Sequence, residues 1–552
     1  MDKKVTKTFC FIQITRLGDL IQTCQVAKEL RAQRPELRLV LIARKQFAAP
    51  LEFLLKDLFD KVYNLDFKYN VNKATELSSI DQYITSFVND VNQEKIDVSI
   101  NFSYSKSSNY LHTLLDSRYK LGPSQNDQNQ TDIFDPWSTI VQANVMRGPF
   151  NPFNLVDIYK RVVGVDQLTP ETFELKDKSI ISIHPFASSE RKSWSIKKWK
   201  EVVIKVLRAN TEISINIVGA KNEAHLAKEL FDDPVIKFFE DRIKNLVGKT
   251  SIEELFVYLQ NSSHFLGHDS MTGHLAKLAN CPTLTVSLGT VRPQETTPYG
   301  HHSYNIVPKT KCFPCFPDET CPNYKCHSDI SYQATSQIVN MFINNEDINE
   351  KSLAENVNLF HLNGIEVFKS EFTSANFFNL KQASANPSDA KSIIRLLLRI
   401  IYLYKFSEIE EDVKFPKLTQ DSYSQLYASL EGVQHLFELS EFGKKYSKDV
   451  ILELAKDSPS INLIKKLTAK IDEIDKLQEM VLQPFPLLTP YVEFFQVMKG
   501  NLKGNNLVEL SESNYILYND YSVLTSTLND LLTKILSEHK INKKTLTNEA
   551  KE

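Results

Sequence analysis

Short apolar runs alternate with amphipathic stretches along the first part of the chain. Between residues 7 and 101, runs rich in β-branched and aromatic residues predict strands, and the stretches between them have the 3.6-residue spacing of a helix with one apolar face. The strand-like runs are TFCFIQI, LRLVLIA, KVYNLDF and IDVSIN, and the helical stretches include 20–34 and 80–92. This alternation predicts a parallel sheet wrapped by helices.

The same alternation begins again after a polar stretch. Residues 166–179, DQLTPETFELKDKS, contain a proline and lack a clear period, so we interpret them as a linker. The next strand-like runs are SIISIHP, EISINIVG and KNLVG, separated by helical stretches at 197–208, 222–231 and 252–260. The sequence therefore predicts two α/β domains, residues 1–178 and 179–345.

The composition changes after about residue 345. Leu, Lys, Ser and Asn dominate, with helical spacing at 422–439, 461–482 and 522–536. We expect residues 346–552 to form a helical appendage, with a short β element around 357–372 before it and a disordered tail over the last dozen residues.

The most apolar stretch of the chain is residues 393–406. It is shorter than the ~20 residues that span a bilayer, and Arg395 and Arg399 interrupt it at helical spacing. A bundle helix is the first interpretation, and a helix on a membrane surface is the alternative.

Length and charge limit the classes of function. A chain of 552 residues that is 42% hydrophobic should divide into about three domains. With 65 basic and 68 acidic residues, the net charge of −3 gives no electrostatic case for a nucleic-acid partner. The N-terminal apolar run FCFIQI is too short for a signal peptide, so we expect a cytoplasmic protein.

The first candidate site is TRLGDL at 15–20, directly after the first predicted strand. Ligands of open α/β sheets bind at the carboxyl ends of strands, so Asp19 would be presented to a ligand and could remove a proton. The alternative is that Asp19 only caps the next helix. The glycine-rich turns of nicotinamide-binding proteins and of P-loops are missing from the sequence.

Residues 264–288 predict a strand, an acidic turn, a short helix and a second strand. Asp269 and Ser270 are residue types that cap helices, and Gly273 would let the backbone approach a ligand. The free backbone amides at such a helix start favour an anion. An ordinary strand-to-helix turn is the alternative.

Two further loops follow predicted strands. In the loop at 183–194, small and hydroxyl residues could close over a ligand, Lys192 supplies a point charge that suits phosphate, and Trp194 and Trp199 would anchor the loop. At the next strand end, Glu223 could accept hydrogen bonds from ribose hydroxyls. A surface loop with an ordinary lysine, and helix capping by Asn222 and Glu223, are the alternatives.

Five segments together resemble glycosyltransferase family 9, the ADP-heptose:lipopolysaccharide heptosyltransferases and their relatives. The segments are RLGDL at 16–20, IHPFASSERKSW at 183–194, VGAKNE at 218–223, LVGKTSIEEL at 246–255 and HDSMTGHLAKLANCPTLTVSLGT at 268–290. Their order and spacing match the family, and the similarity covers roughly residues 7 to 345.

The resemblance implies two facing Rossmann-like domains of the GT-B type, with the acceptor on the first and the nucleotide sugar on the second. It also implies inversion at the anomeric carbon without a catalytic metal. Asp19 would be the general base, with Arg16 and Gly18 in the acceptor or phosphate region. The donor-binding residues would be Ser188, Lys192, Glu223, Asp269, Ser270, Thr272, Gly273 and His274.

The function expected from this resemblance is transfer of a heptose or similar sugar from an ADP-sugar. The acceptor would be lipopolysaccharide core, another saccharide or a protein, with peripheral contact with the inner face of the cytoplasmic membrane. A degenerate family member acting as a sugar-binding or assembly scaffold is the alternative, because Met271 departs from the family's usual donor turn. A nucleotide-sugar epimerase or hydrolase is disfavoured because its catalytic side chains do not occur at the corresponding strand ends. His268, before the aspartate, has no assigned role.

Four of the seven cysteines form a C-x2-C-x5-C-x4-C pattern: Cys312, Cys315, Cys321 and Cys326. In a cytoplasmic protein this spacing favours a tetrahedral thiolate site for a structural Zn or Fe over disulfides. The resemblance supports a metal there, since a related heptosyltransferase group binds iron. Reduced or redox-paired thiols are the alternative.

Overall fold

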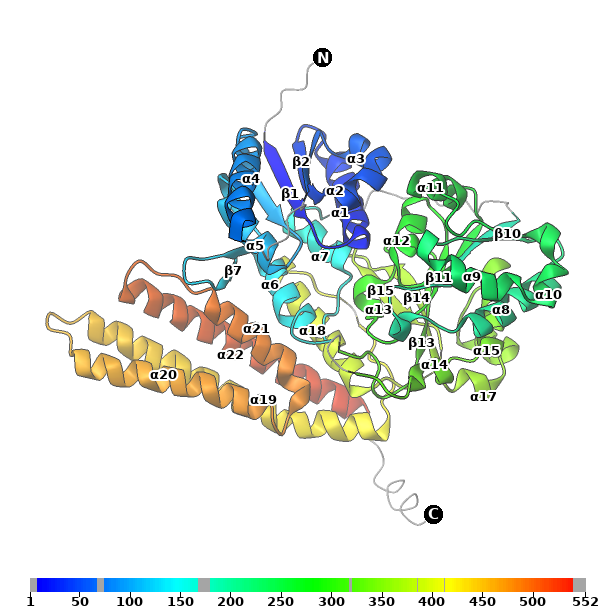
Figure 1. Cartoon of the computed structure of the whole chain (residues 1–552). Coiled ribbons are helices and arrows are strands. Elements are labelled where there is room, and N and C mark those ends of the chain that lie inside the picture. The colour runs from blue at the N-terminus through cyan, green and yellow to red at the C-terminus, as the bar shows by residue number, and fades with distance from the viewer. Residues whose placement is uncertain are drawn as a thin grey trace, which may run out of the picture. The chain divides into compact units, whose positions relative to one another are not determined.

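The computed structural model describes residues 7–66, 74–166, 179–316, 320–384, 386–411 and 413–539 (Figure 1). Most of the predicted linker and the predicted tail lie outside these residues. The chain divides into two units: residues 1–131 with 153–385, and residues 132–152 with 386–552. Each unit therefore combines two separate segments of the sequence.

The first unit contains a five-stranded parallel sheet in the order β3-β2-β1-β4-β5. All six residues of β1 are buried because β1 is the central strand. The strands are β1 (Thr8–Gln13), β2 (Arg38–Arg44), β3 (Lys61–Leu65), β4 (Ile96–Asn101) and β5 (Ser117–Leu121). The helices include α1 (Leu17–Gln33), α3 (Glu52–Leu58), α4 (Ala74–Asn92), α5 (Lys106–Leu114) and α7 (Leu155–Val162).

The second sheet of this unit has eight strands in the order β10-β9-β8-β11-β12-β13-β14-β15. Its first six strands are parallel, and their apolar side chains pack on those of α8 and α15 in one core. The strands are β8 (Ile180–His184), β9 (Ser214–Ile217), β10 (Ile243–Asn245), β11 (His264–His268), β12 (Thr283–Val286) and β13 (Ser303–Pro308). The helices include α8 (Ile196–Ala209), α9 (Ala224–Phe231), α11 (Ile252–Gln260), α12 (Met271–Leu278) and α15 (Tyr332–Ile343).

The predicted boundary at residue 345 differs from the structure. The strands β14 (Ile365–Phe372) and β15 (Phe378–Gln382) add to β13 as antiparallel neighbours, so this α/β part continues to residue 384. The short β element expected near 357–372 is real, but it completes the second sheet. The predicted α/β class, with two parallel sheets and a helical region after them, is confirmed.

The second unit is a helical bundle. Three long helices expected from periodicity are present. Residues 132–152, which the sequence did not assign to this part, belong to the same unit, and their helix α6 (Pro136–Ile140) and a π-helical turn at Val141–Val145 contact the shorter helix α21. The bundle helices are α18 (Ala390–Ser407), α19 (Gln420–Leu454), α20 (Ile461–Val481), α21 (Thr489–Gly500) and α22 (Leu507–Glu538).

Helix α18 contains the most apolar stretch of the sequence. Its Arg399 is buried and forms an ion pair of 2.8 Å with Glu411, so the polar interruption is neutralised inside the bundle. The prediction of a bundle helix is confirmed. Among the described residues, no helix combines the length and apolar character needed to span a bilayer.

Candidate functional site

Asp19 lies in the first turn of α1, shortly after the carboxyl end of β1. The helix begins after the exposed Arg16, and its start has no side-chain cap. The Asp19 carboxylate instead accepts a hydrogen bond from the Thr15 hydroxyl at 2.7 Å. Asp19 is therefore not a capping residue, and its half-buried carboxylate is held beside the strand end.

The turn between β11 and α12 has the predicted strand-turn-helix form. The strand ends at His268, directly before Asp269. Ser270 immediately precedes the helix and has an extended backbone conformation, but its side chain does not cap the helix. The first N–H groups of a helix have no intrahelical acceptor, so this end offers donors to an anion.

His274, on the first turns of α12, brings the two α/β parts together. A Cβ on Gly18 would lie 3.6 Å from Cδ2 of His274, so the first turn of α1 lies close to this helix. Burial lowers the pKa of His274, the charges of Asp269 and Asp19 oppose that effect, and Lys192 adds to it. The charges of three predicted site residues, which follow three different strands, therefore influence the pKa of this one imidazole.

Lys192 ends a short 3-10 turn at Glu190–Lys192, after β8. Behind this turn, Trp194 and Trp199 are buried with their ring centroids 5.5 Å apart, which confirms the predicted anchor. Gly289 approaches from the loop after β12. It has φ +60°, and a Cβ there would lie 2.4 Å from the Arg191 carbonyl oxygen, so only glycine fits beside the Lys192 turn.

Glu223, His184 and Ser270 form a chain of polar contacts across three strand ends. The Glu223 carboxylate lies 3.3 Å from Nε2 of His184, and Nδ1 of that ring lies 3.3 Å from the Ser270 hydroxyl. Burial raises the pKa of Glu223, but the hydrogen bond and charge of His184 and the Ala220 N–H outweigh burial and hold it below its usual value. Glu223 also accepts the Ala220 N–H at 2.7 Å, so it caps its own turn as well.

The remaining predicted residues have different surroundings. Thr272 and Gly273 are buried in α12, whereas Ser188 is exposed in the loop after β8. Met271 is half-buried at the helix start. The structure thus gathers the predicted residues at the carboxyl ends of β1, β8, β9 and β11.

His268 is a structural residue. Its Nε2 accepts hydrogen bonds from Trp199 Nε1 at 2.9 Å and from the Trp194 backbone N–H at 3.2 Å, and its Nδ1 lies 3.2 Å from the Val286 carbonyl oxygen. Complete burial lowers the pKa of His268 to about 3, so the ring is neutral. It holds the tryptophan anchor from the side of β11.

Sequence reasoning did not select two residues that the structure places at this site. His184 joins Glu223 to Ser270, and its position as the last residue of a predicted strand was the available signal. Glu295 is buried beside Arg292. Burial raises the pKa of the Tyr159 hydroxyl, and the charges of Asp19 and Glu295 add to the rise. No pattern in the sequence indicated Glu295.

The four-cysteine segment packs against the Lys192 turn. The Cys315 N–H donates to the Gly289 carbonyl oxygen at 2.8 Å, and His327 Nε2 lies 3.0 Å from the Arg191 carbonyl oxygen. Burial raises the pKa of Cys315, and the other three thiols of the pattern add to the rise. In the described part of the chain, no three His, Cys, Asp or Glu side chains are arranged to hold a metal ion, so the predicted Zn or Fe site stays a prediction.

Comparison with known proteins shows which family part of the chain matches. Residues 160–327, which carry Lys192, Glu223 and Asp269, match the model of glycosyltransferase family 9 (heptosyltransferase). The chain contains a family 9 glycosyltransferase domain. The prediction that this protein is a glycosyltransferase enzyme is confirmed.

Two curated relatives are heptosyltransferases of Campylobacter. Lipopolysaccharide heptosyltransferase 1 of Campylobacter coli is 24% identical over 301 residues, which cover 50% of this chain and 82% of that protein. Lipooligosaccharide heptosyltransferase 2 of Campylobacter jejuni is 27% identical over 158 residues, covering 28% of this chain and 47% of that protein. The structure of the E. coli heptosyltransferase WaaC with ADP aligns with a TM-score of 0.44 and 15% identity, covering 61% of this chain and 99% of WaaC.

Proposed function

We propose that this protein transfers a heptose from an ADP-linked donor to a saccharide acceptor of lipopolysaccharide, with inversion of the anomeric centre. The family 9 domain covers the strand ends that carry the donor-binding candidates. The two curated relatives are named as lipopolysaccharide or lipooligosaccharide heptosyltransferases.

The convergence around His274 carries the proposal. Asp19 comes from the first sheet, and Lys192 and Asp269 come from two strand ends of the second, yet all three charges act on this imidazole. An inverting transfer needs a base near the acceptor hydroxyl and positive charge near the leaving group. Charged groups of both kinds therefore act on the same imidazole, which supports the proposal.

In the proposed reaction, the Asp19 carboxylate removes the proton of the acceptor hydroxyl as its oxygen attacks the anomeric carbon. The bond between that carbon and the diphosphate oxygen breaks, and the electron pair leaves with the diphosphate. Lys192 and the free N–H groups at the start of α12 stabilise the negative charge of the leaving group. The Thr15 hydroxyl, 2.7 Å from Asp19, orients the base.

Glu223 would bind the ribose hydroxyls of the donor. Its carboxylate is kept ionised by His184, so it remains a hydrogen-bond acceptor. The same histidine contacts Ser270. His184 would therefore position both the residue that binds the ribose and the α12 turn that binds the diphosphate.

Replacement of the base tests the proposal. For Asp19→Asn we expect kcat to fall about 10²- to 10⁴-fold, the usual contribution of a positioned base, while the dissociation constant for ADP measured by calorimetry stays the same. Asp57→Asn, an exposed carboxylate in α3 of the same α/β part, is the matched control and should keep full activity.

Two other outcomes would contradict parts of this proposal. Undiminished turnover of Asp19→Asn would remove Asp19 as the base and leave the family assignment intact. A wild-type protein that binds ADP-heptose but transfers no sugar to any lipopolysaccharide core fragment would favour the scaffold alternative.

A further inference from the structure

The end of the hairpin formed by α19 and α20 differs in charge from the rest of the chain. This hairpin end, residues 444–470, holds seven lysines and three acidic residues, a net charge of +4 in a chain whose net charge is −3. Figure 1 shows the turn that joins the two helices at one end of the bundle. A concentration of positive charge on an exposed surface attracts an anionic partner.

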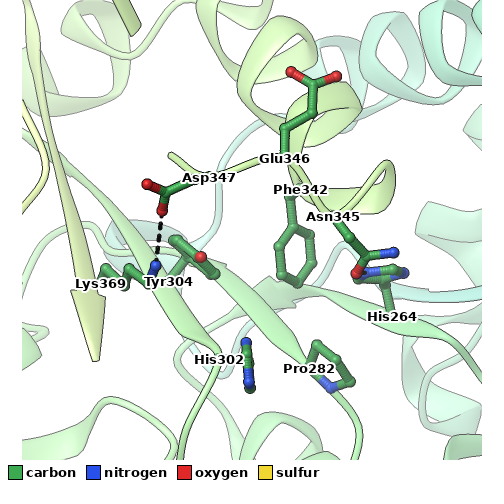
Figure 2. A pocket seen from close by; sticks show the side chains of 9 residues that line it. All are labelled: His264, Pro282, His302, Tyr304, Phe342, Asn345, Glu346, Asp347 and Lys369. Carbon is green, nitrogen blue, oxygen red and sulfur yellow. Dashed lines mark hydrogen bonds and ion pairs between the residues drawn. The ribbon is translucent and has the colours of Figure 1, made fainter. Parts of the chain in front are cut away.

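Most of the positive charge at the hairpin end is not neutralised by neighbouring side chains. Within the described residues, five exposed lysines there form no ion pair: Lys445, Lys448, Lys465, Lys466 and Lys470. By contrast, Lys369 of β14, in the pocket drawn in Figure 2, lies 3.0 Å from the Asp347 carboxylate. The hairpin end therefore keeps a positive charge that a partner can neutralise.

Large apolar side chains are exposed among these lysines. Ile461 is 68% exposed, Leu452 56% and Leu463 41%. On α19, Leu452 follows Lys448 by four residues, and on α20, Lys466 follows Leu463 by three, so leucines and lysines share a face on both helices. A group of exposed apolar side chains with a polar rim is typical of an interaction surface.

The start of α22 adds apolar side chains at the same end of the bundle. The Asn514 side chain donates a hydrogen bond to the Ser447 hydroxyl at 2.7 Å, and Ser522 donates to Glu441, so α22 runs antiparallel to α19. The first turn of α22 is therefore level with the last turn of α19. The exposed apolar side chains of α22 there are Leu507, Val508 and Leu510.

We propose that the hairpin end docks on the surface of an anionic lipid bilayer. Groups of about four to eight lysines or arginines on an amphipathic helix bind anionic lipid headgroups. Leu452, Ile461 and Leu463 would enter the boundary between the headgroups and the acyl chains, where exposed apolar side chains leave water. No residue of the hairpin end belongs to the candidate functional site, so this proposal does not depend on the sugar-transfer reaction.

Two other partners fit the hairpin end less well. A second copy of the chain that docked through the same surface would bring two positive surfaces together, and their repulsion disfavours that contact. A soluble polyanion would neutralise the lysines but would leave the apolar side chains in water. An anionic bilayer satisfies both the charge and the apolar side chains.

Co-sedimentation of the full chain with lipid vesicles tests this proposal. We expect binding to vesicles made of equal parts phosphatidylcholine and phosphatidylglycerol, weaker binding as sodium chloride is added, and little binding to pure phosphatidylcholine. For the triple variant Lys445→Gln, Lys448→Gln and Lys466→Gln we expect the dissociation constant to rise about 100-fold, because each lysine near an anionic surface contributes roughly a fivefold factor.

The apolar contribution has its own test. The double variant Leu452→Ser with Leu463→Ser keeps every charge, and we expect it to bind the anionic vesicles about tenfold more weakly. In Leu463→Trp, the added fluorescence should shift to shorter wavelength when phosphatidylglycerol vesicles are present, because the ring leaves water.

Matched controls remove exposed residues at the other end of α19. The triple variant Lys391→Gln, Lys414→Gln and Lys417→Gln changes exposed lysines near the start of this helix, about 40 Å from Lys448 at 1.5 Å per residue. Tyr427→Ser is the apolar control. Both controls should bind vesicles as the wild type does, and the affinity for ADP should stay constant in every variant.

The proposal is overturned if the wild type does not bind anionic vesicles, or if the lysine variant and its control lose the same affinity. It is also overturned if the leucine variant binds vesicles as tightly as the wild type does. Tighter binding to soluble heparin or polyglutamate than to the vesicles would identify a polyanion as the partner in place of a bilayer.

Discussion

Lys192 adds a positive charge to a neighbourhood that otherwise holds two carboxylates, Asp19 and Asp269. Asp19 and Lys192 could be predicted because each follows a recognisable strand, where ligands of parallel sheets bind. His184 and Glu295 were not predicted, because their roles depend on residues that are distant in the sequence and become neighbours only in the folded chain.

Removal of the Lys192 charge should weaken donor binding. For Lys192→Gln we expect the dissociation constant for ADP, measured by calorimetry, to rise about 10- to 100-fold, since a hydrogen bond to a charged group contributes about 1.5 to 3 kcal/mol. Lys197→Gln, an exposed lysine on α8, is the control. Equal affinities for ADP in the Lys192→Gln variant and the wild type would contradict the assignment of Lys192 to the diphosphate.

Buried histidines should make the fold sensitive to acid. Burial lowers the pKa of His112 and His264 to about 4 and of His268 to about 3, from 6.5. Below pH 6.5 the unfolded chain binds protons that the folded chain does not, so stability is complete above that pH and falls as the pH drops toward 4 and then 3.

At pH 5 each of these histidines should lower the free energy of unfolding by about 1 to 2 kcal/mol relative to pH 7. We expect a clearly lower Tm at pH 5 in scanning calorimetry, and a smaller drop in His112→Asn, which no longer titrates. His225→Gln, an exposed histidine, should behave like the wild type. The same Tm at both pH values would contradict this account.

Among the elements, the loop after β12 shows how one residue shapes its neighbour. Gly289 combines a left-handed conformation with an approach to the Arg191 carbonyl that leaves no room for a side chain. The Lys192 turn therefore depends on a glycine about 100 residues away in the sequence.

Comparing Gly289→Ala with Gly164→Ala separates the effect of the close contact with Arg191 from the effect of backbone strain. For Gly289→Ala we expect a loss of about 1 to 3 kcal/mol in unfolding free energy together with weaker ADP binding, because the Arg191 carbonyl must move. Gly164→Ala is the matched control, since Gly164 has φ +72° but nothing within 4 Å of the added Cβ. Its ADP affinity should not change, and an equal effect of both substitutions on ADP binding would refute the role of the contact.

Most elements could be predicted from apolar periodicity, and α11 has the expected bounds at Ile252–Gln260. The position of β14 in the second sheet could not be predicted, because the residue pattern of a strand does not determine which neighbouring strand it pairs with. Residues 309–364 separate β13 from β14, so the pairing is a property of the tertiary structure.

On the scale of the whole molecule, the helical bundle is built from two distant segments. Trp137, Ile140 and Val141 of the inserted segment are buried, Asn144 accepts the Tyr402 hydroxyl at 3.0 Å, and the Ile133 N–H donates to Asn501 at 3.0 Å. The region after residue 385 is therefore part of a shared core.

Truncation should reveal this dependence. A chain ending at residue 385 would leave the apolar residues of 132–152 without their bundle partners, at about 1.5 to 3 kcal/mol for each large side chain that stays exposed. We expect low solubility and increased binding of a hydrophobic dye. A chain ending at His539, which keeps every described helix, is the control, and a soluble, monomeric protein ending at 385 would contradict the prediction.

The two-segment bundle also sets an order of events on the ribosome. Residues 132–152 leave the exit tunnel early, and residue 386 follows roughly 230 residues later, about 10 to 50 s at the usual rates of synthesis. During that interval the insert has no bundle to join. The nascent chain must therefore stay unaggregated until the bundle residues after 385 have been synthesised.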